Sequence, residues 1–528
     1  GGYHRVRLQG APDLVARLGE WGWPLADRLE GKTDWRAEIR VPASQDGQAG
    51  GLYLELASDL RGLGVDMPEP LGKTAAEVRP LRLWRTLDGQ NDAPLWLQYG
   101  EGLQAVLELE AGAEGQRLVR AGVRLGGGDA RLPADPILQL VGRLPRLSLS
   151  EWQAWQPAGK KDMTTLPPLE VDLAIGQLEL YRRLLRDTAV RLRQRDTEWR
   201  AQLSGRGAQG QARIGNGKQG LERIDLDLDH LHVSRLPDAP HLRKELDLDP
   251  RTLPLLSVKI RDLQLDDRAL GNLMLETLPR PDGLRVEQLT LSGEEYKLQV
   301  QGEWRMNAAG QPLSQFELQL DDANLGALLE TFGHERIMES RRANALLVAN
   351  WPGSPLDFDL DQVEGRLDLD IGAGQLVKLD APAGRLLNIF SVHSLQRRLA
   401  LDFSDVFGKG FSFDSITGHI TFMAGDAYTQ DLVMHAPSAQ IAIAGRTGFV
   451  ARDYDQLVTI TPLVSSSLPL AGVLAGGPAV GAALFVAEKL FGERMNRLAR
   501  YQYQVTGSWD APQLKRLDLS PAPGSGAD

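Results

Sequence analysis

The chain of 528 residues contains no cysteine, which excludes disulfide bonds, thiolate zinc sites and cysteine nucleophiles. It has no surplus of basic residues either, because its formal net charge is -11 at pH 7. A nucleic-acid partner is therefore not expected, since binding a phosphate backbone needs clustered lysine and arginine. Aromatic residues make up only 6% of the chain, which favours a smooth aliphatic lining over shaped aromatic pockets.

Sequence motifs for nucleotide binding are incomplete. Gly72, Lys73 and Thr74 resemble the end of a phosphate-binding loop, but Met67 stands where that loop needs a glycine. The stretch 205–210 (GRGAQG) matches a dinucleotide fingerprint as a string, yet no helical pattern follows it to hold a pyrophosphate. We expect a turn between two strands at 205–210, and we expect no cofactor.

Acidic and histidine residues do not complete a metal site. Asp225, Asp227 and Asp229 begin like a calcium loop, but the sixth and twelfth positions lack the required glycine and glutamate. A spacing of two residues is typical of the solvent-exposed face of a strand. His230 and His232 share a strand face without a third ligand in view. No nucleophile has a base beside it, so we expect no metal, no catalytic residues and no enzyme.

Most of the chain alternates apolar and polar residues, as strands with one covered face and one wet face do. Examples are 52–56 and 171–175, and turn residues such as 281–283 (PDG) and 424–426 (AGD) separate the strands. We predict a mainly β fold: an elongated, twisted antiparallel β-sheet curled into a hydrophobic groove, with a few helices concentrated at the C-terminal end. The candidates for lining the groove are Leu226, Leu228, Val258, Ile260, Leu367, Leu369, Ile371, Ile420, Phe422, Ile441, Ile443, Val458 and Ile460.

The number of strands limits the architecture. About 30 strands at about 4.8 Å each would extend about 140 Å, and a sheet of that width curls or splits. We predict groove segments at 1–156 and 169–380, a C-terminal region with helices at 381–528, and a linker at 157–168, together forming one continuous rod. Helices are predicted at 325–332, with Asp321 or Asp322 as N-cap, and at 386–399.

An uncharged run extends from Gln456 to Ala487, and its apolar part, 468–487, has the length of about 20 residues that spans a bilayer as helix. Prolines and glycines within it favour short hinged helices that lie on or dip into a membrane, followed by a basic amphipathic segment. A buried helical hairpin that caps a soluble core is the alternative. The candidates for membrane contact are Leu468, Leu470, Val473, Leu474, Val480, Leu484, Phe485, Val486, Lys489, Leu490, Phe491, Arg494 and Arg497.

Several segments resemble one known family. The stretch 401–414 (LDFSDVFGKGFSFD) is similar to the C-terminal signature of AsmA-like envelope proteins. The similarity continues at 425–428 (GDAY), 443–446 (IAGR), 453–456 (DYDQ), 465–481 and 503–510 (YQVTGSWD). Two earlier stretches, 68–73 (PEPLGK) and 142–152 (GRLPRLSLSEW), resemble the middle region of the family. The similarity is greatest to the large YhdP-type members and covers most of the chain.

The resemblance implies a bridge-like lipid transfer protein of the Gram-negative periplasm, anchored in the inner membrane by an N-terminal helix that this sequence lacks. This chain would be the C-terminal portion, which delivers phospholipid to the inner leaflet of the outer membrane. Phospholipid and membrane are the implied partners, and protein partners stay open. A start at Gly1 and Gly2 without a signal peptide gives the expectation of a piece of a longer protein. The strand pattern equally allows a non-catalytic β-sandwich scaffold that assists outer-membrane assembly.

Overall fold

The computed structural model describes residues 3–12, 28–42, 51–87, 93–112, 115–155, 166–180, 183–217, 220–236, 248–377, 411–463 and 501–517. The chain divides into two compact units. The first unit comprises Gly1–Asp247 and Val258–Asp267, and the second comprises Leu248–Ser257 and Arg268–Asp528. Each unit is built on a β-sheet, which confirms the predicted mainly β fold.

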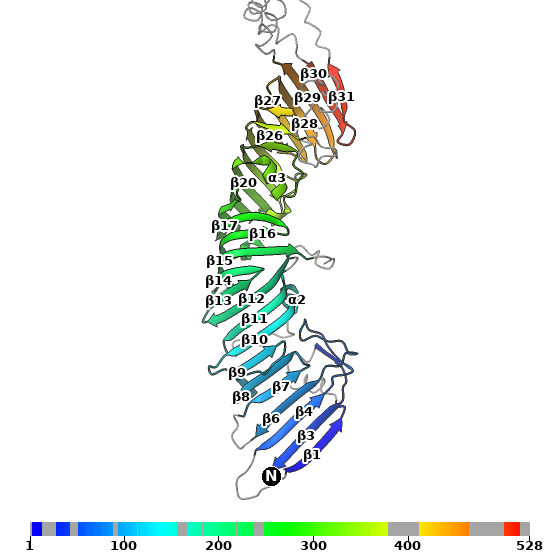
Figure 1. The fold of residues 1–528 in the computed structure, drawn as a ribbon, viewed down its shortest axis with the longest axis vertical. Coiled ribbons are helices and arrows are strands. Elements are labelled where there is room, and N and C mark those ends of the chain that lie inside the picture. Colours follow the sequence, from blue (N-terminus) through cyan, green and yellow to red (C-terminus); the bar gives the residue numbers. More distant parts are fainter. Residues whose placement is uncertain are drawn as a thin grey trace, which may run out of the picture. The chain divides into compact units, whose positions relative to one another are not determined.

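The sheet of the first unit joins its strands in chain order, from the blue β1 to the green β15 of Figure 1. A small pair, β2 with β5, lies outside that sheet. The strands are β1 (Tyr3–Gly10), β2 (Leu29–Gly31), β3 (Trp35–Pro42), β4 (Leu52–Ser58), β5 (Leu63–Val65), β6 (Leu81–Leu87), β7 (Leu95–Tyr99), β8 (Leu103–Gly112), β9 (Gly115–Leu125), β10 (Leu138–Ser148), β11 (Leu169–Leu180), β12 (Arg183–Arg195), β13 (Glu198–Gly205), β14 (Ala208–Gly217) and β15 (Gly220–Arg235).

Strand β10 pairs in parallel with both of its neighbours, β9 and β11, whereas the other described pairs are antiparallel. Parallel neighbours need long connections, and residues 126–137 and 149–168 provide them. The first connection lies close to the sheet, since a Cβ on Gly122 would stand 1.9 Å from the backbone oxygen of Arg131. The predicted antiparallel sheet is therefore right except at β10.

The sheet of the second unit also joins consecutive strands, and β21, β24 and β25 form a separate small sheet. Strand β16 (Leu255–Leu265) has residues in both units. The other strands are β17 (Arg268–Arg280), β18 (Gly283–Ser292), β19 (Lys297–Met306), β20 (Pro312–Ala323), β21 (Met338–Ser340), β22 (Ala343–Pro352), β23 (Glu364–Ile371), β24 (Gly374–Leu376), β25 (Phe411–Phe413), β26 (Ser415–Met423), β27 (Asp426–His435), β28 (Ala439–Gly448), β29 (Asp453–Pro462), β30 (Tyr501–Ser508) and β31 (Gln513–Leu517).

The tight turns lie where the sequence predicted them. Strands β26 and β27 are joined through Ala424 and Gly425, whose φ angles are 53° and 80°. Two successive positive φ angles match the twist of a hairpin, and glycine adopts them without steric cost. The predicted turns at 281–283 and 205–210 also connect consecutive strands, β17 to β18 and β13 to β14.

Helices are short in the part of the chain that the structure describes. They are α2 (Leu149–Ala154), α3 (Leu325–Thr331) and the 3-10 turns η4 (Pro250–Thr252) and η5 (Pro355–Asp357). Helix α3 confirms the prediction at 325–332, but its N-cap is Asn324, because Asp321 and Asp322 still belong to β20. The helix predicted at 386–399 and most of the linker at 157–168 lie outside the described residues. The three predicted segments remain a prediction.

Candidate functional site

One face of the first unit carries an unbroken row of aliphatic residues, here called the central row. Each member lies directly opposite the next on the neighbouring strand, and opposed residues point to the same face of a sheet. The row crosses the unit at right angles to its strands, through Leu8, Ala37, Leu56, Leu83, Leu97, Ala105, Val123, Leu140, Val171, Leu192, Ala201, Ala212 and Leu226.

The rows on either side of the central row are also mostly apolar. One contains Ser58, Leu81, Tyr99, Leu103, Leu125, Gly142, Leu173, Val190, Leu203, Gly210 and Leu228. The other contains Val6, Ile39, Leu54 and Arg85 on the first strands, Leu95, Leu107, Ala121, Leu138 and Leu169 on the middle strands, and Gln194, Trp199, Ile214 and Ile224 on the last strands. Arg85 alone among these positions carries a charge.

The central row is only partly covered. Leu56, Leu83 and Leu140 are half-buried, Leu8 is 60% exposed, and of the whole row only the alanines Ala105 and Ala212 are buried. A sheet face packed against a second layer would bury such residues almost fully. The first unit therefore presents a continuous aliphatic strip that is only partly shielded from solvent.

A small lobe, residues 59–80 together with β2, lies against the row next to the central row. The side chains of Ser58 and Tyr99 point to the apolar face, and both contact the lobe: the Leu60 backbone nitrogen donates to Ser58 Oγ at 3.0 Å, and Tyr99 Oη donates to the Leu71 oxygen at 2.7 Å. Trp152 in α2 donates to the Glu69 oxygen at 3.2 Å. The lobe therefore forms a wall on one side of the strip.

The second unit repeats the pattern with its own aliphatic row. The row contains Leu275, Leu289, Val300, Leu318, Leu347, Leu367 and Ile420. The first six are half-buried, and Ile420 is buried at 1% exposure. On β26 to β29 the apolar face is buried throughout, as at Ile416, Met434, Ile441 and Ile460. Access to the apolar face thus decreases along the second unit toward its last strands.

Aromatic residues concentrate beside the row of the second unit. Phe316 stacks on Trp351 at 5.5 Å between ring centroids, and Trp351 meets Phe358 edge to face at 5.1 Å. Phe449 contacts Trp509 at 5.9 Å in the same edge-to-face manner. These rings belong to or adjoin a buried cluster that contains Val286, Phe316, Ala349, Trp351, Val363, Ile420, Phe422, Ala427 and Phe449. They give the second unit a fixed core.

The structure brings many of the predicted groove residues together. Leu367 lies opposite Ile420, Ile441 opposite Ile460, and Ile443 opposite Val458. Of the predicted set, Leu226, Leu367 and Leu369 are half-buried. The others are buried: Leu228, Val258, Ile260, Ile371, Ile420, Phe422, Ile441, Ile443, Val458 and Ile460. Their contact with a ligand remains a prediction, and it is best founded for the half-buried ones.

The predicted membrane-contact residues, from Leu468 to Arg497, lie outside the described residues. Among the helices that the structure describes, none is long and apolar enough to span a bilayer. The described residues also contain no group of three or more histidine and acidic side chains arranged to hold a metal ion.

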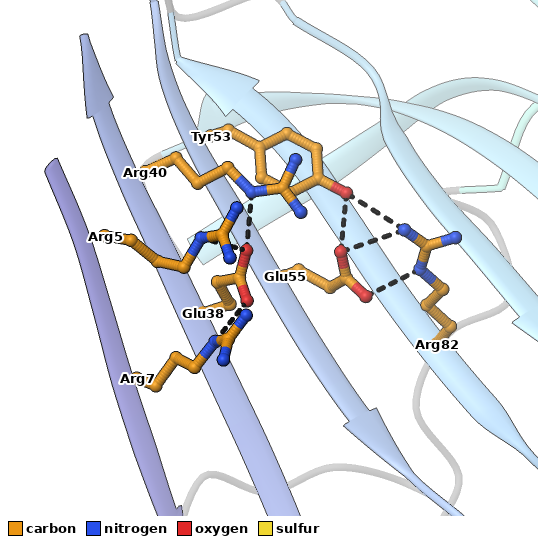
Figure 2. Close-up of polar contacts among 7 residues, drawn as sticks. All are labelled: Arg5, Arg7, Glu38, Arg40, Tyr53, Glu55 and Arg82. Carbon is orange, nitrogen blue, oxygen red and sulfur yellow. Dashed lines mark hydrogen bonds and ion pairs between the residues drawn. The ribbon is translucent and has the colours of Figure 1, made fainter. Parts of the chain in front are cut away.

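The opposite face of the first unit carries ion pairs, and Figure 2 shows those on its first strands. Glu38 on β3 binds three arginines: Arg40 at 2.5 Å, Arg7 at 2.9 Å and Arg5 at 3.3 Å. On the neighbouring strands Arg82 contacts Glu55 through two nitrogens, at 2.7 and 2.9 Å. The hydrogen bonds with Arg40 and Arg7 lower the pKa of Glu38, and the bond with Arg82 lowers that of Glu55. Both carboxylates thus stay ionised and hold neighbouring strands together.

The motifs that resembled ligand sites have structural roles. Lys73 is buried, and its Nζ donates to the backbone oxygens of Leu60, Leu63 and Thr74 inside the lobe. Asp229 pairs with Arg261 at 2.9 Å. His232 bonds Asp262 at 2.8 Å. These side chains are engaged with the protein itself.

Of the central row, the groove residues predicted from the sequence include only Leu226. A signal was present, because Leu81, Leu83 and Leu87 alternate with Arg82 and Thr86 in this part of the sequence.

Comparison with known proteins supplies the biological context. A family model described as YhdP protein matches residues 2–514. The chain is also similar to the intermembrane phospholipid transporter YhdP of Escherichia coli (strain K12), with 24% identity over 526 residues. That match covers 96% of this chain and 40% of the relative, so the chain spans about 40% of the length of the curated relative it matches. No solved structure matches it significantly.

Proposed function

Because the chain belongs to the YhdP protein family, we propose that it is part of a conduit that moves phospholipid between two membranes. The half-buried aliphatic rows carry the acyl chains. The single observation that supports this most strongly is the central row, which has no polar member from Leu8 to Leu226. Transport requires no catalytic residue, so we propose a non-enzymatic protein.

The energetics of a lipid tail suit such a row. Each methylene taken out of water is worth about 0.8 kcal/mol, so a lipid can leave a bilayer only if another apolar surface receives its tails. The central row spans twelve strand pairs, which at about 4.8 Å each gives a path of about 58 Å. That path is longer than the hydrocarbon core of a bilayer, about 30 Å. Its members are all Leu, Val or Ala, so successive positions along it are nearly equivalent and barriers between them are low.

The degree of burial favours a conduit over a closed sandwich scaffold. In a sandwich, a second sheet covers the inner residues. Leu56, Leu83, Leu97 and Val171 are instead half-buried, and the lobe stands beside them. Carbon atoms that water can reach can also be reached by an acyl chain.

Lipid analysis of the purified chain tests the proposal. Mass spectrometry of an organic extract should detect phospholipid in stoichiometric amount. Leu140→Asp should remove most of it, because a carboxylate would interrupt the row. Gln139→Asp on the other face of the same strand is the matched control and should retain the lipid. Absence of lipid from the unaltered chain, together with no uptake from vesicles, would contradict the proposal.

We further propose that the chain lies in the periplasm and that the run 456–487, with the basic segment after it, contacts the inner leaflet of the outer membrane. The uncharged run and the basic segment that follows suit an anionic lipid surface. Replacing both Leu474 and Phe485 with aspartate should abolish flotation with liposomes that contain anionic lipid. Undiminished flotation of this double variant would count against the docking role.

A further inference from the structure

We propose that the first strands of the first unit bind an acidic protein surface on the face opposite the aliphatic rows, an interaction that is separate from lipid transport. This face, here called the arginine face, is formed by β1, β3, β4, β6 and β7 (Figure 2). Its side chains alternate with those of the apolar rows. They include Tyr3, Arg5, Arg7, Arg36, Glu38, Arg40, Tyr53, Glu55, Arg82, Trp84 and Trp96.

The arginine face has a surplus of positive charge, although the whole chain carries a formal net charge of -11. Among the described side chains of its strands, it carries five arginines and two glutamates. The surplus lies around one of these glutamates, Glu38, because Arg5, Arg7 and Arg40 share its carboxylate. Arg36 is exposed on the same face of the same strand. An anion that approaches this part of the sheet is therefore attracted to it.

The arginines around Glu38 keep part of their hydrogen-bonding capacity. Arg7 and Arg40 each donate to Glu38 through Nε, and the closest contact of Arg5 with Glu38 also uses Nε. The two terminal nitrogens of a guanidinium group can donate two parallel hydrogen bonds to a second carboxylate. The side chains of Arg5, Arg7 and Arg40 are 40%, 67% and 35% exposed, whereas that of Glu38 is 19% exposed. The face thus presents guanidinium groups, rather than a carboxylate, to a partner.

Two arginines further along the same face are arranged differently. On β12, Arg191 and Arg193 also lie two residues apart, and both are exposed. Each lies opposite its own carboxylate on β11, since Asp172 pairs with Arg191 and Glu170 pairs with Arg193. These two arginines are therefore neutralised within the sheet, unlike the three that share one glutamate.

The residue types favour a protein over a lipid bilayer as the partner. Arginine, tyrosine and tryptophan are enriched in protein interfaces, and the sequence of these five strands contains no lysine, which interfaces use less. Half-buried Trp84 and Trp96 stack at 5.9 Å between ring centroids, and the guanidinium of Arg82 lies 5.0 Å from the Trp84 ring. Membrane-binding surfaces combine basic side chains with aliphatic ones that insert. Alternation instead puts Val6 and Leu8 on the other face of β1.

The spacing of the guanidinium groups specifies the partner further. Arg5 and Arg7 lie two residues apart on one strand, which corresponds to about 7 Å. Arg5 also lies directly opposite Arg40 on the neighbouring strand. Carboxylates at alternate positions of an extended segment have the same spacing of about 7 Å. We therefore expect a partner whose surface carries aspartate or glutamate at every second position of a strand.

Peptide binding to the whole chain tests the inference. The probe is a fluorescent peptide in which aspartate alternates with threonine, and a second peptide has asparagine in place of each aspartate. Fluorescence anisotropy should detect binding of the aspartate peptide, weaker at high salt because salt screens exposed charges, and no binding of the asparagine peptide. The double variant Arg5→Gln and Arg7→Gln should weaken binding at least about tenfold, the effect of one lost charge-assisted contact. Lysine at both positions, which keeps the charge and loses the fork, should give an intermediate Kd.

The matched control is the double variant Arg191→Gln and Arg193→Gln, which removes two exposed arginines that are neutralised in the sheet. Its Kd for the aspartate peptide should stay within about twofold of that of the unaltered chain, and circular dichroism verifies that each variant is folded. Equal weakening by both double variants, or equal affinity for both peptides, would show that the arginine face is not the site.

Two further measurements identify the kind of partner. Vesicles of phosphatidylglycerol are tested in the same way, and binding to them through Arg5 and Arg7 without binding to the aspartate peptide would make the assignment to a protein wrong. Sedimentation of the chain alone detects self-association. Self-association that the double variant of Arg5 and Arg7 abolishes would support the inference and would identify the acidic partner as a second copy of this chain.

Discussion

Lys73 is a buried cation whose hydrogen-bond acceptors are backbone oxygens of the lobe. Its Nζ lies 2.9 Å from the Leu60 oxygen and 2.9 Å from the Thr74 oxygen, and it also contacts the Leu63 oxygen. Burial lowers the pKa of this ammonium group. The lysine thus adds to the β2–β5 pairing of the lobe, and it fixes the wall beside the aliphatic strip.

Lys73→Met should lower the free energy of unfolding of the first unit by about 1–3 kcal/mol, because buried carbonyl oxygens lose their donor. Urea unfolding followed by tryptophan fluorescence measures the change. Lys259→Met, at an exposed position on β16, is the control and should stay within about 0.5 kcal/mol of the unaltered protein. Equal stability of the two variants would show that the lobe does not depend on Lys73.

The ion pairs of Glu38 predict that the stability of the protein depends on pH. Its pKa in the folded protein is below its ordinary value of 4.5, owing first to the hydrogen bond from Arg40 and then to that from Arg7. A depressed pKa means that the stabilisation is present above the unfolded value and is lost as the pH falls through the folded value. The melting temperature of Glu38→Gln should therefore lie below that of the unaltered protein at neutral pH, and the two should converge in acid. A difference independent of pH would contradict the role of the carboxylate.

At the scale of elements, alternation of residue types predicted strands well. The patterns at 52–56, 171–175 and 367–371 became β4, β11 and β23. The sequence could not show that β10 pairs in parallel on both sides, because strand direction depends on how long connections cross the sheet. Nor could alternation show which residues of different strands lie opposite one another, and this register is what creates the central row. Residues 381–410 and 464–500, on which several predictions fall, lie outside the described part of the chain.

The assignment of Asn324 as the N-cap of helix α3 can be tested. Asn324 accepts a hydrogen bond from the Ala327 backbone nitrogen at 3.3 Å. Asn324→Ala should therefore lower the free energy of unfolding of the second unit by about 1 kcal/mol, whereas Asp321→Ala on β20 should have a smaller effect. Chemical denaturation of both variants measures this. A larger effect for Asp321→Ala would contradict the assignment of Asn324 and would favour Asp321, which was one of the two N-caps predicted from the sequence.

At the scale of the whole chain, both units use one device: a sheet whose opposed residues form aliphatic rows on one face while ion pairs join strands on the other. The first unit does so from Leu8 to Leu226, and the second from Leu275 to Ile420. On β26 to β29 the same face is buried, which makes that part a core of the second unit. Acyl chains are therefore expected along the whole row of the first unit and on the earlier strands of the second unit.

Photo-crosslinking to lipid along the first unit tests this account most directly. Benzoylphenylalanine is introduced in the central row, at Leu56, Val123, Val171 or Leu226, and in separate variants at outward neighbours, at Ala57, Arg124, Asp172 or Asp225. In cells, illumination should attach phospholipid at each position of the row and at none of the outward ones. Equal labelling of the two sets, or labelling of the outward set alone, would contradict the claim that the aliphatic rows carry lipid.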